Sequence, residues 1–282
     1  MVTVVVSCFN YGAYLNDAVG SLKSQDGGPP QIIVVDDGST DPETHRVLRE
    51  LDDDPQVVVV RQENGGVARA RNNGLGRATT PLVMALDADD MLAPGALQAL
   101  RAALAENPDA MYAYGQIKYV GNWAGEMRFP PYDPWRLAFR HIVGPTALVR
   151  RELIEATGGY DPDFKYYEDW ELWVHALAHG MHGVKVERPG HLYRKHGVSR
   201  VTSFRTNFRQ ANRELRSKHS RLYGDLAALR RSSRIGLRER LVYRWIWGAR
   251  PWPAWAEDNA YALVWGLAGA LRGLRSTTST QR

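Results

Sequence analysis

The sequence predicts an α/β fold: a mostly parallel central sheet flanked by helices, with a helical extension at the C-terminus. Short β-branched runs alternate with amphipathic helical segments over the first hundred residues, and this alternation implies crossover connections. The 282 residues, 44% of them hydrophobic, suit one large domain, or one domain with an appendage. We expect the domain to span residues 1–204 and the extension to span residues 205–282.

Four short apolar runs are the predicted strands of the first half. They are Val2–Val6, Ile32–Val35, Val57–Val60 and Leu82–Leu86. Between the first two, apolar residues from Leu15 to Leu22 recur at helical spacing. The turn at Asn64–Gly66 precedes another helical segment, and Pro94 opens the next one. Beyond about residue 110 the pattern becomes irregular and rich in aromatic residues and proline.

Acidic residues follow two of these strands. Asp36 and Asp37 end the second strand, and Asp87, Asp89 and Asp90 end the fourth. In a parallel sheet ligands bind outside the carboxyl ends of the strands, so we expect one site at this edge. Carboxylates this close repel one another unless a positive group lies among them.

Both acid clusters have a functional and an ordinary interpretation. The Asp87-x-Asp89 pair offers hard oxygen ligands that suit Mn²⁺ or Mg²⁺ shared with a diphosphate, but a polar turn explains the pattern equally well. Asp37 is a candidate acceptor for a nucleobase ring N–H or a ribose hydroxyl. The alternative is a turn before a helix, because Ser39, Thr40 and Asp41 are all good caps.

The segment Tyr166–Trp173 predicts the start of a helix with an apolar side, and Asp169 lies on that side. Asp169 is either an N-cap or a general base in an aromatic cleft that tunes its pKa. On the same helix Glu171, His175 and His179 are spaced by four residues, which could suggest zinc. We expect a solvated face there instead.

The segment "LYRKHGVS" places His196 beside Arg194 and Lys195. Such cationic segments are usually surface. One that returns to a metal–diphosphate site could supply a further metal ligand and neutralise charge.

Several chemistries are disfavoured. Cys8 is the single cysteine, so no internal disulfide or cysteine metal cluster is expected, and a reducing cytoplasm fits best. The chain contains no glycine-rich dinucleotide loop after a strand, no phosphate-binding P-loop and no serine nucleophile elbow. The N-terminal apolar run reads as a core strand, not a signal peptide, and no apolar stretch reaches the roughly 18 residues of a membrane span.

Charge divides the chain. Residues 1–204 carry 20 Lys and Arg against 26 Asp and Glu, whereas residues 205–282 carry 16 against 5. The basic tail also contains Trp245, Trp247, Trp252 and Trp255. It either packs on the body or docks on anionic lipid, in which case the acceptor could be lipid-linked. We expect no nucleic-acid partner, because nothing resembles a recognised binding module.

Six stretches in register carry a resemblance to a known family. They are "VSCFNYGAYLNDAVGSLKSQ", "IIVVDDGSTD", "NGGVARARNNGL", "LDADDMLAPGAL", "GGYDPDFKYYEDWELW" and "YRKHGVS". Together they resemble the family 2 glycosyltransferases, which have the GT-A fold, over about residues 1–200. The resemblance implies transfer of a sugar from a nucleotide-diphosphate donor to an acceptor hydroxyl with inversion, assisted by Mn²⁺ or Mg²⁺. A role in cell-surface glycan or glycolipid synthesis, in the cytoplasm or at the inner face of the cell membrane, would fit.

The resemblance also implies roles for residues, by their position in the motifs. Nucleotide contacts fall on Ser7, Phe9, Asp37, Arg71 and Asp87; metal ligands on Asp89 and His196; the catalytic base on Asp169; and supporting roles on Glu168, Asp36 and Arg194. The assignment of the base relies on the dipeptide Glu168–Asp169, so Glu168 is its alternative. Uridine is the expected base, although thymidine presents the same edge to Asp37.

Two other functions stay open. A sugar nucleotidyltransferase would also bind nucleotide and metal at the end of a parallel sheet, but it would carry a glycine-rich, basic loop after the first strand, where this chain has "SCFNYGAYL". A non-catalytic nucleotide-sugar-binding protein is disfavoured by the presence of Asp37, Asp89 and Asp169 together.

Overall fold

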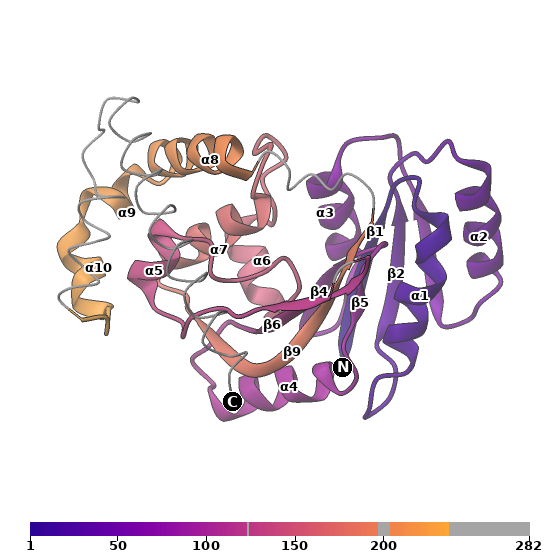
Figure 1. The fold of residues 1–282 in the computed structure, drawn as a ribbon, viewed down its shortest axis with the longest axis horizontal. Coiled ribbons are helices and arrows are strands. Elements are labelled where there is room, and N and C mark those ends of the chain that lie inside the picture. The colour runs from indigo at the N-terminus through magenta and orange to yellow at the C-terminus, as the bar shows by residue number, and fades with distance from the viewer. Residues whose placement is uncertain (123, 197–203, 237–282) are drawn as a thin grey trace, which may run out of the picture. The chain divides into compact units, whose positions relative to one another are not determined.

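The computed structural model describes residues 1–122, 124–196 and 204–236 (Figure 1). They belong to two compact units, Met1–Leu222 and Tyr223–Arg282. The helix α8 that opens the predicted extension is part of the first unit. The four tryptophans of the predicted extension lie outside the described residues.

The first half of the first unit alternates strand and helix, as predicted. Its elements are β1 (Val2–Cys8), α1 (Gly12–Lys23), β2 (Gln31–Asp36), α2 (Pro42–Asp52), β3 (Val57–Arg61), α3 (Val67–Arg77), β4 (Leu82–Asp87), β5 (Met91–Leu92) and α4 (Ala96–Glu106).

The second half contains longer strands and several short helices. Its elements are β6 (Tyr112–Gly121), β7 (Gly125–Met127), α5 (Pro134–Phe139), β8 (Ala147–Arg150), α6 (Arg151–Thr157), α7 (Glu168–Ala178), β9 (Gly183–Lys195) and α8 (Phe204–Lys218). The helix α9 (Ser220–Gly224) runs across the boundary between the units, and α10 (Leu226–Ser232) lies in the second, where Asp225 caps it by accepting from the Ala228 N–H at 2.9 Å.

One sheet runs through the first unit in the order β3-β2-β1-β4-β8-β6-β9-β5, with β7 paired to β6. The four strands predicted from sequence are all parallel, and β8 is antiparallel to both β4 and β6. The register sets Ser7 opposite Val35 on one side and Asp87 on the other. The two acid clusters therefore meet at one edge of the sheet, and the predicted mostly parallel α/β fold is confirmed.

Both faces of the central strands are buried, which explains why they read as continuous apolar runs. On one face Val4 and Val6 belong to the core that also contains residues of α1, α2 and α4. On the other face α3 approaches so closely that a Cβ at Gly74 would lie 2.3 Å from Cγ1 of Val5. The glycine therefore allows α3 to cover the face opposite α1 and α2 (Figure 1).

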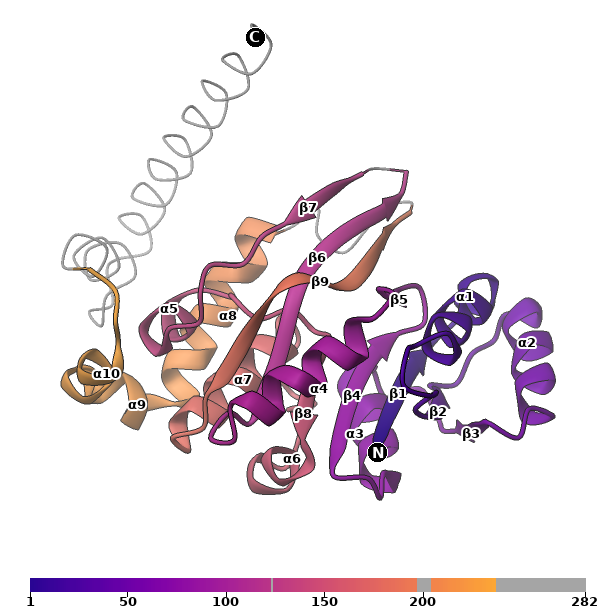
Figure 2. The ribbon, with the colours of Figure 1, turned by 90° about the horizontal axis from the view of Figure 1, so that it is seen from below.

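The strand β9 connects the far part of the sheet to the acid clusters. It runs parallel to β6 from Gly183 opposite Tyr112 to Lys195 opposite Gly121, with register shifts near Gln116. The C-terminal part of β9, at His191 and Leu192, also pairs with β5. Figure 2 shows the long strands β6 and β9 beside the short β5. This path returns the end of β9 to the loop that follows β4.

No helix among the described residues is long and apolar enough to cross a membrane.

Candidate active site

A buried arginine neutralises the first acid of the cluster after β4. Arg71, on α3, donates from Nη2 to Asp87 Oδ1 at 2.7 Å and from Nη1 to Glu168 Oε1 at 2.9 Å. Ser7 Oγ, at the end of β1, also donates to Asp87 Oδ1, at 3.0 Å. Arg71 thus joins the end of β4 to the beginning of α7, which brings two motifs that are far apart in sequence to one place.

The two acids that Arg71 bridges respond differently to burial. Burial opposes ionisation of Asp87, but the charge of Arg71 and the hydrogen bonds from Arg71 and Ser7 hold its pKa below the ordinary value. Burial raises the pKa of Glu168, and Arg71 offsets that effect only in part. Asp87 is therefore the permanent counter-ion of Arg71.

Asp89 lies in a different environment from Asp87. Its Oδ2 is 2.9 Å from Nε2 of His196, and the two side chains are 23% and 25% exposed. Burial and the negative charges of Asp90 and Asp87 raise the pKa of Asp89. The side-chain partner of Asp89 is thus a histidine, whereas that of Asp87 is an arginine.

The third acid, Asp90, anchors the end of β9. Its Oδ2 is 2.6 Å from Nε2 of His191, and its Oδ1 accepts from the backbone N–H of Arg194 at 2.9 Å. The guanidinium of Arg194 then donates to the backbone oxygen of Asp89 at 3.0 Å and to Asp17 at 2.8 Å. These bonds bring His196, at the end of the "YRKH" motif, to Asp89.

The acids after β2 organise the neighbouring loops. Asp36 Oδ1 accepts from the N–H of Ser39 at 3.0 Å. Asp37 is buried, and its carboxylate accepts from Gln62 Nε2 at 2.7 Å and from the N–H groups of Gly65 and Gly66 at 2.8 Å each. The side chain expected to read a nucleobase therefore also fixes the turn before α3.

Aromatic side chains line the same edge. Phe9, predicted at the nucleobase pocket, is 42% exposed just beyond β1. The Tyr14 ring stacks on His196 with a centroid distance of 4.6 Å, and the Tyr11 ring meets His196 edge-on at 5.5 Å. The sequence analysis missed both tyrosines, which lie within the "FNYGAYL" stretch where only Phe9 was singled out.

Asp169 is the second residue of α7, so the alternative of an N-cap is wrong. The N-cap residue is Tyr167, in the left-handed region at φ 60° and ψ 40°, and it makes no side-chain cap bond. Asp169 Oδ1 accepts from the N–H of Trp170 at 2.9 Å, and Oδ2 is 2.9 Å from Nε2 of His141. Burial would raise the pKa of Asp169, but His141 and Arg71 bring it below the ordinary value.

His141 is a residue that the sequence analysis missed. It lies between α5 and β8, 28 residues before its partner Asp169, in the region that sequence patterns left irregular. No spacing or motif links the two residues. Only the packing of α5 against α7 brings them together.

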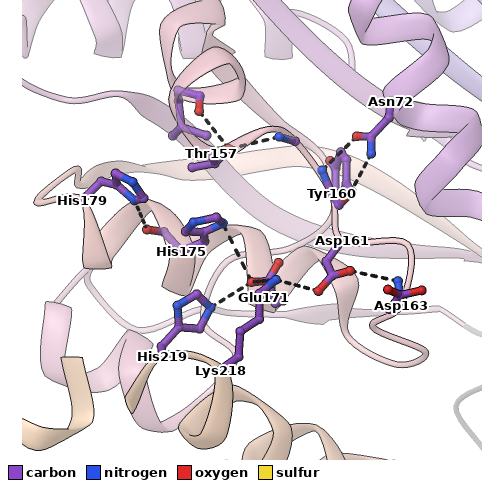
Figure 3. A network of polar contacts seen from close by, with 12 residues as sticks. Asn72, Thr157, Tyr160, Asp161, Asp163, Glu171, His175, His179, Lys218 and His219 are labelled. Atoms are coloured by element: carbon purple, nitrogen blue, oxygen red, sulfur yellow. Dashed lines mark hydrogen bonds and ion pairs between the residues drawn. The ribbon is translucent and has the colours of Figure 1, made fainter. Parts of the chain in front are cut away.

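The expectation of a solvated face at Glu171, His175 and His179 is wrong for Glu171, whose side chain is 0% exposed. The reason is the end of α8: Glu171 Oε1 lies 2.7 Å from Nζ of Lys218, the last residue of α8, and 2.8 Å from Nε2 of His219, which follows it (Figure 3). Hydrogen bonds from His219 and Lys218, together with the charge of Lys218, lower the pKa of Glu171 against the effect of burial. Within the described ranges, no group of three or more His, Cys, Asp or Glu is arranged to hold a metal ion.

Known proteins resemble this chain in sequence and in fold. The family Glycosyl transferase family 2 matches residues 3–158. Succinoglycan biosynthesis protein ExoU of Rhizobium meliloti is 28% identical over 93% of this chain and 83% of its own length. The UDP-Gal:alpha-D-GlcNAc-diphosphoundecaprenol beta-1,3-galactosyltransferase of Escherichia coli is 24% identical over 62% of this chain and 66% of its own length.

Coverage of other relatives is smaller. The chain spans 20% of the uncharacterized protein y4gI of Sinorhizobium fredii, at 36% identity over 63% of this chain. Among solved structures, S. aureus TarS 1-349 in complex with UDP-GlcNAc has a TM-score of 0.62 and 21% identity, with 72% of this chain and 60% of that chain covered. This likeness supports the expected GT-A fold. From the family match over more than half of its length, the chain belongs to glycosyl transferase family 2.

Proposed function

We propose that this protein is an inverting, metal-dependent glycosyltransferase that moves a sugar from a UDP-sugar to an acceptor hydroxyl in cell-surface glycan or glycolipid synthesis. The observation that carries the proposal is the Asp87–Arg71–Glu168 bridge, which joins the acid cluster to the residue beside Asp169. A donor held at the strand ends would therefore lie near a carboxylate of α7. The names of the relatives point the same way, to succinoglycan biosynthesis and to transfer from UDP-Gal.

The proposed nucleotide site uses the edge where β1, β2 and β4 end. Phe9 offers an exposed ring for the base, and Asp37, with Asp36 behind it, offers oxygen acceptors. Ser7 and Asp87 are the proposed contacts of the ribose and diphosphate, and Arg71 holds Asp87 by a hydrogen bond. Arg194 is a supporting cation close to Asp89.

The residues present suit a hard divalent cation. Asp89 supplies carboxylate oxygens and His196 an imidazole nitrogen, 2.9 Å apart, and the diphosphate would supply the remaining oxygen ligands. Asp89 lies among like charges without a full cation of its own, which favours binding of positive charge. When bound, Mn²⁺ or Mg²⁺ would supply Lewis-acid neutralisation of charge on the departing diphosphate.

Asp169 is the proposed source of base catalysis toward the acceptor hydroxyl. The oxygen of that hydroxyl attacks the anomeric carbon from the face opposite the diphosphate, so that a single displacement inverts the configuration. Glu168, ion-paired to Arg71, is the proposed support of this arrangement.

The basic C-terminal extension is the proposed contact with an anionic membrane surface. This proposal rests on the 16 Lys and Arg against 5 Asp and Glu in residues 205–282 and on the tryptophans among them. It suits a lipid-linked acceptor at the inner face of the cell membrane. Sedimentation of the full chain with anionic vesicles, absent with neutral vesicles, is the expected result.

A thermal-shift panel of UDP, dTDP, GDP and CDP, with and without Mn²⁺, tests the donor site. We expect stabilisation by UDP that needs Mn²⁺, about 2.7 kcal/mol at a hundred times the dissociation constant. Asp89→Ala should abolish the shift, whereas the control Asp109→Ala, at an exposed acid, should keep it. If no nucleotide stabilises the wild-type protein, the proposed function is wrong.

A further inference from the structure

Aromatic rings hold the imidazole of His196 beside Asp89. Its Nε2 is 2.9 Å from Asp89 Oδ2, and its Nδ1 has no hydrogen-bond partner in the part of the chain that the structure describes. A histidine that binds a metal usually donates its other ring N–H to a carboxylate or carbonyl, which fixes the ring. Here the Tyr14 ring stacks on the imidazole at 4.6 Å, with 28° between the planes, and the Tyr11 ring meets it edge-on at 5.5 Å. The two tyrosines thus restrain the ring where a hydrogen bond commonly does.

Tyr14 also contacts the end of β9. The guanidinium carbon of Arg194 lies 5.1 Å from the centroid of the Tyr14 ring. That guanidinium is held by Asp17, three residues after Tyr14 on α1, at 2.8 Å and by the backbone oxygen of Asp89 at 3.0 Å. One ring therefore touches both Arg194 and His196, so α1 binds the end of β9 and the residue that follows it.

The first turn of α1 is packed closely on its neighbours. The N–H of Gly12 donates to Thr44 Oγ1 at 2.8 Å, and a Cβ at Gly12 would lie 2.4 Å from Cα of Thr44. This turn therefore lies directly against the backbone of α2. Leu15, which follows Tyr14, is fully buried in the core. Tyr14, itself half-buried, thus projects from a well-anchored part of the helix, which suits a residue that orients another.

We propose that Tyr14 is a positioning residue of the cation site, whose ring fixes the imidazole of His196 beside Asp89 before the divalent cation and the diphosphate bind. This role rests on the cation site of the proposed function and deepens it. A ligand that is already ordered loses less conformational entropy on binding. Removal of the ring should therefore weaken binding of the cation and leave the chemical step itself unchanged.

The matched variants are Tyr14→Leu and Tyr14→Phe. Leucine suits a helix but has no ring, whereas phenylalanine keeps the ring and loses only the hydroxyl. The electron paramagnetic resonance signal of free Mn²⁺ gives the dissociation constant of the ion in the presence of UDP, without turnover. We expect Tyr14→Leu to weaken binding by about 10- to 100-fold, the usual loss when a group that orients a metal ligand is removed, and Tyr14→Phe by less than about threefold.

Two outcomes of this titration would overturn the inference. One is a Tyr14→Leu variant that binds Mn²⁺ within about threefold of wild type, and the other is a Tyr14→Phe variant that binds as weakly as Tyr14→Leu. Urea unfolding confirms that each variant is folded. If Tyr14→Leu does not fold, Tyr14→Gln, which also lacks a ring, gives the same test.

A double-mutant cycle tests whether Tyr14 acts through His196. The variant His196→Ala removes the imidazole on which the tyrosine stacks. We expect Tyr14→Leu to weaken Mn²⁺ binding in the otherwise wild-type protein and to have almost no further effect in His196→Ala. A merely structural role of Tyr14 would give the same fold-loss in both backgrounds, and that result would overturn the inference.

Turnover provides a further readout. The assay is release of UDP from UDP-glucose, UDP-galactose and UDP-N-acetylglucosamine with water as acceptor, at increasing Mn²⁺. We expect Tyr14→Leu to need about 10- to 100-fold more Mn²⁺ for half-maximal activity and to reach a kcat within about threefold of wild type at saturation. A kcat that stays low at saturating Mn²⁺ would contradict a role confined to positioning the ligand.

The outcomes keep the two proposals apart. If the wild-type protein binds no Mn²⁺ with UDP, the proposed cation site fails and the role of Tyr14 fails with it. If wild type and Tyr14→Leu bind Mn²⁺ equally, only the role of Tyr14 fails. If Mn²⁺ binding depends on Tyr14 but no donor releases UDP, the role of Tyr14 stands and the proposed sugar transfer fails.

Discussion

Two groups of acids in the first unit contrast in how their charge is neutralised. After β4, Asp87 has Arg71 as partner and Asp90 has His191, but Asp89 faces only His196 and has a raised pKa. On α7, by contrast, Glu171 is paired with Lys218 of α8 and with His219, the next residue, and has a lowered pKa (Figure 3).

Exposure and pairing with positive groups distinguish an acid with a structural role, such as Glu171, from the proposed ligand-binding acid, Asp89. The side chain of Glu171 has no exposed surface, and its carboxylate is paired with Lys218 and His219 of the same chain. Asp89 keeps 23% of its side chain exposed, and burial together with the charges of Asp90 and Asp87 raises its pKa. Removal of the first should therefore cost stability, and removal of the second should cost function.

The largest effect is expected for Asp89→Ala. UDP release should fall on the order of 10³-fold, because several kcal/mol of charge stabilisation at the diphosphate are lost. The free energy of unfolding should change by less than about 1 kcal/mol, since the variant also relieves repulsion from Asp87 and Asp90. Kinetics and urea unfolding measure the two quantities. If Asp89→Ala loses as much unfolding free energy as Glu171→Ala, Asp89 is a structural acid and the two acids do not differ in role.

Glu171→Ala should have the opposite profile. We expect a loss of about 3 kcal/mol in the free energy of unfolding, because Lys218 and the buried His219 lose their shared counter-ion. Urea unfolding measures it. The matched control is Glu155→Ala on α6, where a 60% exposed acid pairs with Arg151 and the expected cost is below about 1 kcal/mol. Equal losses in the two variants would contradict the structural role of Glu171.

Acid should remove this stabilisation. The pKa of Glu171 is lower in the folded protein than its ordinary value of 4.5, so the contribution is fully present above that pH. It is lost as the pH falls through the folded pKa. The difference in unfolding free energy between wild type and Glu171→Ala should therefore shrink below about pH 4.5. If the difference in unfolding free energy instead grows as the pH falls, the pKa of Glu171 is not lowered on folding.

The smallest effect is expected for Asp161→Asn. Asp161 contacts the same ammonium, with Lys218 Nζ 2.6 Å from Oδ2, but both side chains are partly exposed. We expect less than about 1 kcal/mol in urea unfolding. The two variants thus compare a partly exposed and a fully buried acid on one lysine. A cost that matches that of Glu171→Ala would show that burial does not set the difference.

Sequence periodicity predicted the parallel half of the sheet because its signal is local. Each of the four predicted runs lies within a strand of the structure, and the acid clusters lie at the strand ends. The strands β6 and β9 were not predicted. Gly115, Gln116 and Lys118 interrupt the apolar pattern of β6, and β9 contains Pro189 and Gly190, which ordinarily argue against a strand. The pairing of β6 with β9 accommodates Pro189 and Gly190 because the register shifts near Gln116, which lies opposite Pro189.

The candidate site divides in the same way. Asp87, Asp89 and Asp169 stand in motifs and could be selected from sequence, although their roles remain proposals. His141 could not be selected, nor could the partners of Glu171, Lys218 and His219, because tertiary packing alone brings these residues together. A solvated face was the reasonable expectation for Glu171 since its helix gives no sign that α8 will cover it.

The path of β9 bears on the order of folding. His196 meets Asp89 across 107 residues of sequence, Arg194 meets Asp90 across 104 and Arg194 meets Asp17 across 177. Contacts of such separation carry a high loop-closure cost and form late. The proposed donor site would therefore be among the later parts of the sheet to assemble during folding. A nucleotide bound at the proposed site would hold the end of β9 in place and so slow the first step of unfolding.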